Sequence, residues 1–292
     1  MPELPEVETM ARDLASLRGR SIVSVILNDP SLAAYPSAPA LIEQLTGRRV
    51  RLISRRAKWL QLWLDKGVLL FHPRMTGRPE LTSADTPLAK HVRAQVTFDD
   101  GRELRLNDMR RFARLVLLPQ ADNDSLLGSD GQPFFASYGP EPLEASFTPH
   151  VLSARLRGGR PLKSALLDQA VLSGLGNIYA DEALYRASLH PLRAAGSLNQ
   201  DEIDRLYHSI VAVLSEGIAA RGASVSDYQA PAGGASMQNL LRVYRRTGAD
   251  CARCGDVIAR FVVGGRGTHI CPTCQPAIGP MATSSVNASA AS

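Results

Sequence analysis

The sequence predicts an α+β multidomain fold: an N-terminal helix plus a β-sandwich, then a helical domain, then a small C-terminal β-hairpin. Short alternating apolar segments fill residues 21–118, and apolar residues recur at helical spacing over residues 148–219. The four cysteines all lie between residues 251 and 274. At about 100–200 residues per domain, 292 residues give room for about two domains and a sizeable core.

The first predicted element is a helix over residues 5–17. Pro5 suits a first helical turn, and the glutamates beside it complement the positive end of the helix dipole. Apolar residues then recur at helical spacing. Helix initiation does not require Pro2 and Glu3, so these two residues are candidates for another role.

Seven short, mostly alternating segments follow, and turn signals such as DKG and DDG separate several of them. Such a series favours a β-sandwich or barrel-like sheet. The strands are predicted at residues 21–27, 49–54, 59–64, 68–72, 94–98, 103–107 and 113–118.

The segment at residues 120–134 is polar and rich in Gly and Asp, which predicts a domain boundary. Helices are predicted after it, and SGLG joins the second and third of them in a helix–turn–helix arrangement. A loop over residues 221–236 and a disordered tail are also expected. The helices are predicted at residues 148–157, 163–172, 177–187 and 200–219, and the domains at 1–130, 131–244 and 245–275, with the tail at 276–292.

The positive charge of the chain is mostly arginine, since four of its 33 Lys and Arg residues are lysines. Arginine suits phosphates and base edges better than lysine does, so a net charge of +5 weakly favours nucleic acid over a merely basic surface. No apolar run reaches the roughly 18 residues that span a bilayer. The acidic start lacks the layout of a signal peptide, and a cytosolic protein is expected.

The cysteines form two C-x-x-C pairs, Cys251 with Cys254 and Cys271 with Cys274. Two such turns can build the tetrahedral sulfur cage that zinc prefers in closed, structural sites; the alternative is four free thiols that happen to cluster. Strand, turn and strand are expected between the pairs, with Arg266 at or near the tip. Such a basic hairpin is either a phosphate reader or a solvated surface.

The turn before the third predicted helix is a candidate anion site. In SGLGNIYADEALY the glycines permit a tight turn, and Asn177 is expected to cap the helix that follows. The unpaired N–H groups of a helix start attract phosphate, and Lys163 would add a charge. Ordinary capping within a helical bundle explains the pattern equally well.

Two loops of the predicted sheet domain carry apolar side chains beside arginines. FHPRMTG places His72 and Met75 after a strand, and NDMRRFA places Arg110, Arg111 and Phe112 between two strands. Both loops either simply close the sheet or form a wedge that enters a duplex and fills a vacated base position.

The chain contains six short motifs: MPELPEVE, RRAKWL, H-x-x-M, D-x-RRF, GLGNIYADE and the C-x-x-C after RRTGAD. Together they resemble the formamidopyrimidine-DNA glycosylase (Fpg) family, to which the endonuclease VIII enzymes are related. The matches run in order along nearly the whole chain. The resemblance implies a helix–two-turn–helix domain, a zinc finger with one structural Zn²⁺, and damaged double-stranded DNA as partner. It also implies a bifunctional glycosylase and abasic-site lyase that acts through a proline Schiff base and β,δ-elimination.

The resemblance also assigns roles. After removal of Met1, Pro2 would be the nucleophile, Glu3 would transfer protons, and Lys58 would contact phosphate and assist catalysis. Arg266 would join this catalytic set and, with Asn177, clamp phosphates. The other DNA-contacting positions would be the gap-filling Met75, Arg110 and Phe112, the neighbouring Arg111, and the phosphate-contacting His72 and Lys163.

The chemistry of an N-terminal nucleophile follows from its pKa. At about pH 7.4 roughly a quarter of α-amines are neutral, against roughly a thousandth of lysine side chains. Attack of such an amine at a sugar C1′ expels the base and leads to an iminium ion. That cation acidifies the C2′–H bond, so phosphate elimination becomes feasible. Glu3 is one residue away and can deliver and collect the protons.

The expected substrates are oxidised purines, namely 8-oxoguanine and formamidopyrimidines, together with abasic sites. The same chemistry with a preference for oxidised pyrimidines or abasic sites is the first alternative, because residues 223–239 keep only a loose likeness to the family. The others are a catalytically silent DNA-binding protein and a zinc-ribbon protein that binds RNA or acts as a scaffold. We expect a monomer that does not bind membranes, in a bacterial-type cytoplasm and associated with the nucleoid.

Overall fold

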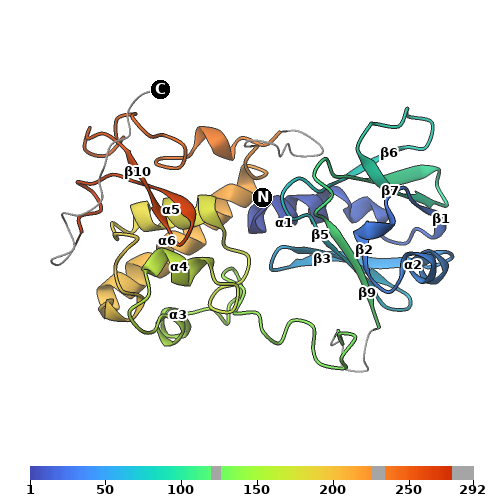
Figure 1. Ribbon diagram of the computed structural model, residues 1–292, viewed down its shortest axis with the longest axis horizontal. Coiled ribbons are helices and arrows are strands. Elements are labelled where there is room, and N and C mark those ends of the chain that lie inside the picture. Colours follow the sequence, from blue (N-terminus) through green and yellow to red (C-terminus); the bar gives the residue numbers. More distant parts are fainter. Residues whose placement is uncertain (120–125, 225–233, 278–292) are drawn as a thin grey trace. The chain divides into compact units, whose positions relative to one another are not determined.

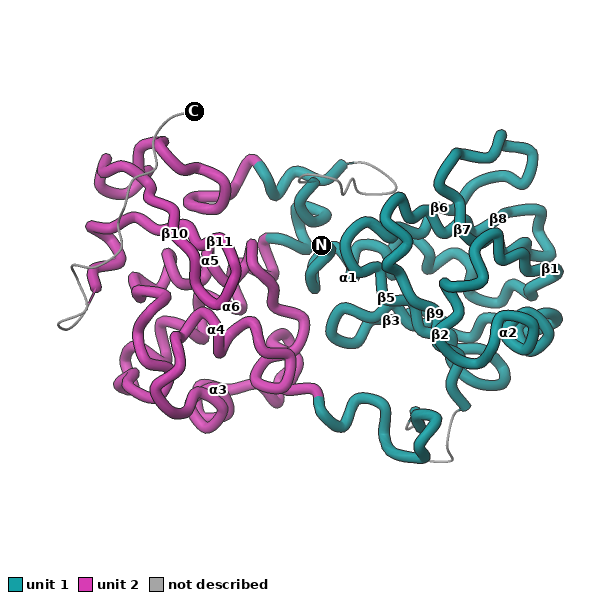
Figure 2. The backbone as a smooth tube through the Cα atoms, in the orientation of Figure 1, with its two compact units in different colours: residues 1–137, 217–238 teal, residues 138–216, 239–292 magenta. Residues whose placement is uncertain are grey.

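The computed structural model describes residues 1–119, 126–224 and 234–277 (Figure 1). Most of the predicted tail, part of the loop expected at 221–236 and part of the boundary expected at 120–134 therefore lie outside the described residues. The chain forms two compact units, coloured in Figure 2. Unit 1 comprises residues 1–137 and 217–238, and unit 2 comprises residues 138–216 and 239–292.

Unit 1 starts with helix α1 (Leu4–Asp13), which is shorter than predicted. The backbone N–H of Leu14 bonds to the carbonyl oxygens of Met10 and Arg12, and a 3₁₀ turn follows at Ala15–Leu17. The chain thus tightens in the way common at helix ends. The apolar spacing continues through this turn, which is why periodicity alone extends the helix too far.

Two sheets form the predicted β-sandwich. All seven predicted strands are present, together with three unpredicted elements: β2 (Ala33–Tyr35), β6 (Arg78–Ser83) and helix α2 (Ala38–Leu45). The four-stranded sheet has the order β1 (Ile22–Leu27), β7 (Val92–Phe98), β8 (Arg102–Asn107) and β6 (Arg78–Ser83). The five-stranded sheet has the order β2 (Ala33–Tyr35), β9 (Arg114–Leu118), β5 (Val68–His72), β4 (Trp59–Leu64) and β3 (Val50–Arg56).

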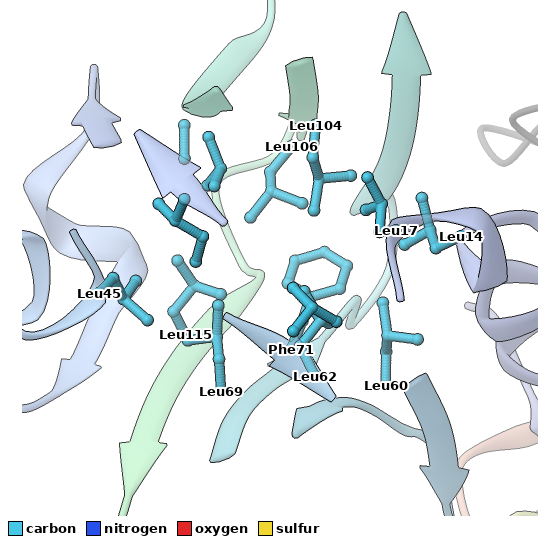
Figure 3. Close-up of a cluster of buried hydrophobic side chains, with 14 of the residues drawn as sticks. Leu14, Leu17, Leu45, Leu60, Leu62, Leu69, Phe71, Leu104, Leu106 and Leu115 are labelled. Atoms are coloured by element: carbon cyan, nitrogen blue, oxygen red, sulfur yellow. The ribbon is translucent and has the colours of Figure 1, made fainter. Parts of the chain in front are cut away.

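The core of unit 1 lies between these sheets and α1. Figure 3 shows Leu104 and Leu106 of β8 facing Leu62, Phe71 and other side chains of the second sheet, with residues of the α1 region at one side. Burial of apolar area contributes roughly 25 cal/mol per Å². This packing holds α1 against β3 and β4 and so gives the start of the chain a defined position.

Unit 2 contains the predicted helices and the hairpin. Its elements are α3 (Pro149–Arg155), α4 (Leu162–Leu167), α5 (Asn177–Arg186), most of α6 (Gln200–Ala219), β10 (Ala259–Val263) and β11 (Arg266–Ile270). The helix predicted over 163–172 ends at Leu167, because the Asp168 side chain accepts the N–H of Ala170 and turns the chain. None of the described helices is long and apolar enough to cross a membrane.

Candidate active site and metal centre

The N-terminal residues are buried and held in place. Pro2 and Glu3 are both buried, and the backbone N–H of Glu3 donates to Glu6 Oε2 at 2.8 Å as part of a capping box. Glu3 is the N-cap residue of α1, so the expectation that the start of the helix does not need Glu3 is wrong. Glu6 Oε1 accepts the N–H of Ala223 at 2.8 Å. Gly222 has φ +78°, and a Cβ there would lie 2.9 Å from Glu6 Oε1. Glu6 therefore fixes the start of α1 to the segment that follows α6.

Lys58 lies in the tight connection between β3 and β4, and it is 6% exposed. The preceding residue, Ala57, has a left-handed φ of +53°, a backbone conformation that is unfavourable for residues other than glycine. Arg55 holds this turn: its Nη1 donates to the Ala57 carbonyl at 3.0 Å, and its Nε lies 3.3 Å from Glu8 Oε2 on α1. The same helix that carries Pro2 and Glu3 thus positions the Lys58 turn.

His72 ends β5 and is neutral. Its Nδ1 accepts the backbone N–H of Arg74 at 3.0 Å, so the ring proton is on Nε2. Burial, with smaller contributions from the Arg74 and Lys58 charges, lowers the pKa of His72 to about 3. The ring packs edge-on against Trp59, with centroids 4.8 Å apart. His72 can therefore donate one hydrogen bond at any pH above about 3.

The two predicted wedge loops are tied together by Asp108. Its carboxylate accepts the hydroxyl of Thr76 in the first loop and the N–H groups of Arg110 and Ala113 in the second. Three apolar side chains remain exposed on these loops: Met75 by 37%, Met109 by 50% and Phe112 by 46%. The Arg110 guanidinium lies over the Phe112 ring, 5.0 Å from its centroid. The loops therefore present apolar groups and a cation to solvent, as a wedge requires.

Arg111 has a different environment from Arg110. Its Nε and Nη2 form a bidentate pair with Asp29 at 2.6 and 3.0 Å, and its φ is +59°. The hydrogen bond from Arg111 holds the pKa of Asp29 far below its usual range, although burial opposes the shift. The geometry gives Arg111 the role of an anchor for the second loop, and its direct DNA contact stays a prediction.

The turn before α5 differs from the prediction in one respect. Gly176, not Asn177, is the N-cap residue, and Asn177 is the first residue of the helix. The Asn177 side chain makes no capping hydrogen bond; its Nδ2 instead donates to the Gly267 carbonyl of the hairpin at 3.0 Å. Gln169 organises the turn by accepting the N–H of Gly174 and donating to the Leu175 carbonyl.

Lys163 is fully buried, although the sequence suggests a phosphate contact. Its ammonium donates to the Gly267 carbonyl at 2.8 Å and to Thr268 Oγ1 at 2.9 Å, and it pairs with Asp181 Oδ1 at 2.6 Å. Asp181 Oδ2 also accepts the N–H of His269 at 3.0 Å. These contacts give Lys163 a positioning role for the hairpin, and a direct phosphate contact stays a prediction.

Arg266 lies at the tip of the hairpin, as predicted. Val263 pairs with Arg266 across the turn of Gly264 and Gly265, whose φ values of +55° and +74° are those of a tight two-residue hairpin turn. Arg266 is exposed, while the next residues are held by the Lys163 network. The exposed side chain of Arg266 therefore stands on a backbone that the Lys163 network fixes.

The four cysteines form the predicted cage. Their Sγ atoms all lie within 4.8 Å of one another, at 3.8 Å for Cys251 and Cys274 and 3.4 Å for Cys254 and Cys271. Zn–S bonds of about 2.3 Å in a regular tetrahedron place sulfurs about 3.8 Å apart. Backbone N–H groups of Arg253 and Cys274 point at two of the sulfurs, as suits thiolates. The donor set fits zinc and leaves no open coordination position.

The sequence comparisons agree with this geometry. The N-terminal domain of formamidopyrimidine-DNA glycosylase matches residues 1–115, its H2TH domain matches residues 138–229, and the zinc finger found in FPG and IleRS matches residues 250–277. The formamidopyrimidine-DNA glycosylase of Chloroflexus aurantiacus is 43% identical over 279 residues, which cover 94% of this chain and 98% of that protein. The chain belongs to the formamidopyrimidine-DNA glycosylase family.

The fold of this chain is also similar to solved structures of family members. Lactococcus lactis Fpg in complex with DNA containing an abasic site has a TM-score of 0.86 and 35% identity, and the match covers 94% of this chain and 100% of that one. The same enzyme with DNA containing an oxidised pyrimidine gives the same values. The predicted family, fold class, glycosylase activity and structural zinc are thereby confirmed, as is DNA as a partner.

The sequence predictions gave no site role to several residues that hold the site together. Each of these residues bonds to a partner that lies far away in the sequence. They are Glu6, Asp29, Arg55, Asp108 and Asp181. Asp108 belongs to the D-x-RRF motif, which was the one available signal of its importance. The motif does not show that its carboxylate joins two loops.

Proposed function

We propose that this enzyme excises oxidised purines, namely 8-oxoguanine and formamidopyrimidines, and cleaves the strand at the resulting abasic site with Pro2 as nucleophile. The buried, hydrogen-bonded start of α1 carries this proposal. Chain ends are ordinarily frayed, whereas Pro2 and Glu3 have a defined place in unit 1. With Met1 attached, the Pro2 nitrogen is a tertiary amide and cannot attack, so removal of Met1 is part of the proposal.

The reaction uses the secondary amine directly. The Pro2 nitrogen attacks C1′, the glycosidic bond between C1′ and the base breaks, and the base leaves with a proton. Opening of the sugar ring converts the adduct to an iminium ion, and loss of a C2′ proton expels the 3′ phosphate. A second elimination expels the 5′ phosphate, and water then hydrolyses the remaining iminium to an aldehyde and the free Pro2 amine. Glu3, next to the amine, transfers protons at the sugar, and Lys58 contacts phosphate.

The remaining site residues are proposed to bind the damaged strand. His72 donates through Nε2, and Asn177 and Arg266 bind backbone phosphates. Met75, Arg110 and Phe112 fill the space of the extruded nucleotide, which their exposure on two tethered loops supports. We also propose that the protein acts as a monomer in the cytoplasm, in association with the nucleoid.

Borohydride trapping tests the proposal. Protein without Met1 is mixed with duplexes that contain 8-oxoguanine, an oxidised pyrimidine, an abasic site or no lesion, and the iminium is reduced in place. We expect a covalent adduct on the N-terminal peptide, placed on Pro2 by mass spectrometry, and none on the undamaged duplex. An adduct on a lysine, or an equal yield from protein that retains Met1, would overturn the assignment of Pro2.

Preference for oxidised pyrimidines is the second candidate, and the Lactococcus lactis Fpg complex with such a lesion favours testing it. The rates of trapping on the two base lesions decide between the candidates. Faster trapping on 8-oxoguanine supports the proposal, and faster trapping on the pyrimidine supports the alternative.

A further inference from the structure

One face of α5 contacts the zinc finger at three successive points. Asn177, Asp181 and Tyr185 are spaced four residues apart and so lie above one another on the helix. Asn177 bonds to Gly267, and Asp181 bonds to His269. The third contact differs in kind, because the Tyr185 hydroxyl lies 3.2 Å from the Sγ of a zinc ligand, Cys251.

The direction of this third hydrogen bond follows from the chemistry of the ligand. A cysteine bound to zinc is a thiolate and carries no proton, so it can only accept. The Tyr185 hydroxyl must then be the donor. Tyr185 is 5% exposed and packs with Val243, Ile258 and Cys271, so the bond lies in a region of low dielectric, where hydrogen bonds to charged groups are strong.

Arg253 strengthens this donor. Its guanidinium carbon lies 4.6 Å from the centroid of the Tyr185 ring, and its Nη1 is fixed by Ser188 Oγ at 2.8 Å. A cation over the ring withdraws electron density from the phenol and makes its O–H a better donor. The backbone N–H of Arg253 also points at Cys251 Sγ, at 3.4 Å.

We propose that Tyr185 is a positioning residue of the zinc site, whose hydroxyl stabilises the Cys251 thiolate and thereby raises the affinity of the site for the metal. Four thiolates around Zn²⁺ leave a net charge of −2, and hydrogen bonds to sulfur spread that charge. Without the Tyr185 donor, the negative charge on Cys251 Sγ has one hydrogen bond fewer to stabilise it, and this sulfur holds the metal less tightly. Because the bond originates on α5, it also joins the metal site to the helix that carries Asn177.

The variant Tyr185→Phe removes the hydroxyl and keeps the ring, so the packing is retained. Tyr207→Phe is the matched control, since Tyr207 lies on α6 in the same unit and packs against Phe147. Zinc-loaded proteins are titrated with a chromogenic chelator. Outer-shell partners are typically worth about 10- to 100-fold in metal affinity. We expect Y185F to lose zinc at a correspondingly lower chelator concentration, and Y207F to match the wild type.

Cobalt substitution separates this role from a merely structural one. With Co²⁺ in the cage, removal of a hydrogen bond to a thiolate raises the energy of the sulfur electrons. The sulfur-to-cobalt charge-transfer band of Y185F should therefore move to lower energy, with the band of Y207F unchanged. An unshifted band in Y185F would overturn the proposal even if zinc were lost sooner, and so would wild-type resistance to the chelator.

Discussion

Replacing Lys163 by methionine is expected to destabilise unit 2 by about 3 to 5 kcal/mol, the usual range when one partner of a buried ion pair is removed. Lys163 and Asp181 both have fully buried side chains, with 2.6 Å between Nζ and Oδ1. Methionine has nearly the same length and leaves no large cavity. The Asp181 carboxylate then keeps the His269 contacts and loses its cation, while the Gly267 carbonyl loses one of its two donors.

Denaturation of the zinc-loaded protein, followed by two probes, measures this loss. Far-UV circular dichroism reports the helices, most of which belong to unit 2. Tryptophan emission reports unit 1, because both tryptophans, Trp59 and Trp63, lie on β4. Lys90→Met, at an exposed position, is the control and should change stability by less than about 0.5 kcal/mol. A loss below about 1 kcal/mol in K163M would refute the argument that the buried pair holds the hairpin.

Four further predictions concern other residues. The pKa of His72 is about 6.5 in the unfolded chain and about 3 in the folded protein. The free energy of unfolding therefore has its full contribution from neutral His72 above about pH 6.5, and this contribution is lost as the pH falls toward 3. His72→Gln should flatten the urea-derived stability profile between these values by about 1.4 kcal/mol per pH unit, and parallel profiles would contradict this. Arg55→Lys should slow Schiff-base trapping by about 10- to 100-fold, because the turn that carries Lys58 would lose its position. An unchanged rate would show that Arg55 does not position this turn for the reaction. Arg266→Gln should lower the slope of log affinity against log salt by about one, and an unchanged slope would argue against its phosphate contact. Glu6→Gln leaves one acceptor oxygen for two backbone N–H groups, so amide exchange should accelerate at Glu3 or Ala223, which hydrogen-exchange mass spectrometry detects.

Local patterns predicted much of the fold. Alternation along residues 94–98 and 103–107 indicated strands that the structure confirms, and the cysteine spacing indicated the cage. β6 was missed because RPELTS has little alternation and belongs to an edge strand, where proline is tolerated. β2 has three residues, which is too few for any periodicity to appear.

The polar contacts of the site could not be predicted in the same way. Glu6 and Ala223 are 217 residues apart, and Lys163 and Thr268 are 105 apart. Such pairs leave no periodic trace, because each carboxylate or ammonium is locally indistinguishable from a surface charge. The family resemblance identified Lys163 as important, but only the fold shows that its partners lie inside unit 2.

Arg110 and Arg111 show why neighbouring residues of one type take different roles. Both follow Asp108 in the same loop, and the sequence offers no reason to separate them. The positive φ of Arg111 turns its side chain back to Asp29, which satisfies two of its donors and fixes the loop. Arg110 is then left beside Phe112 at the tip. In the proposed wedge, Arg111 therefore serves as the anchor of the loop through Asp29, and Arg110 is the arginine that remains available for a DNA contact.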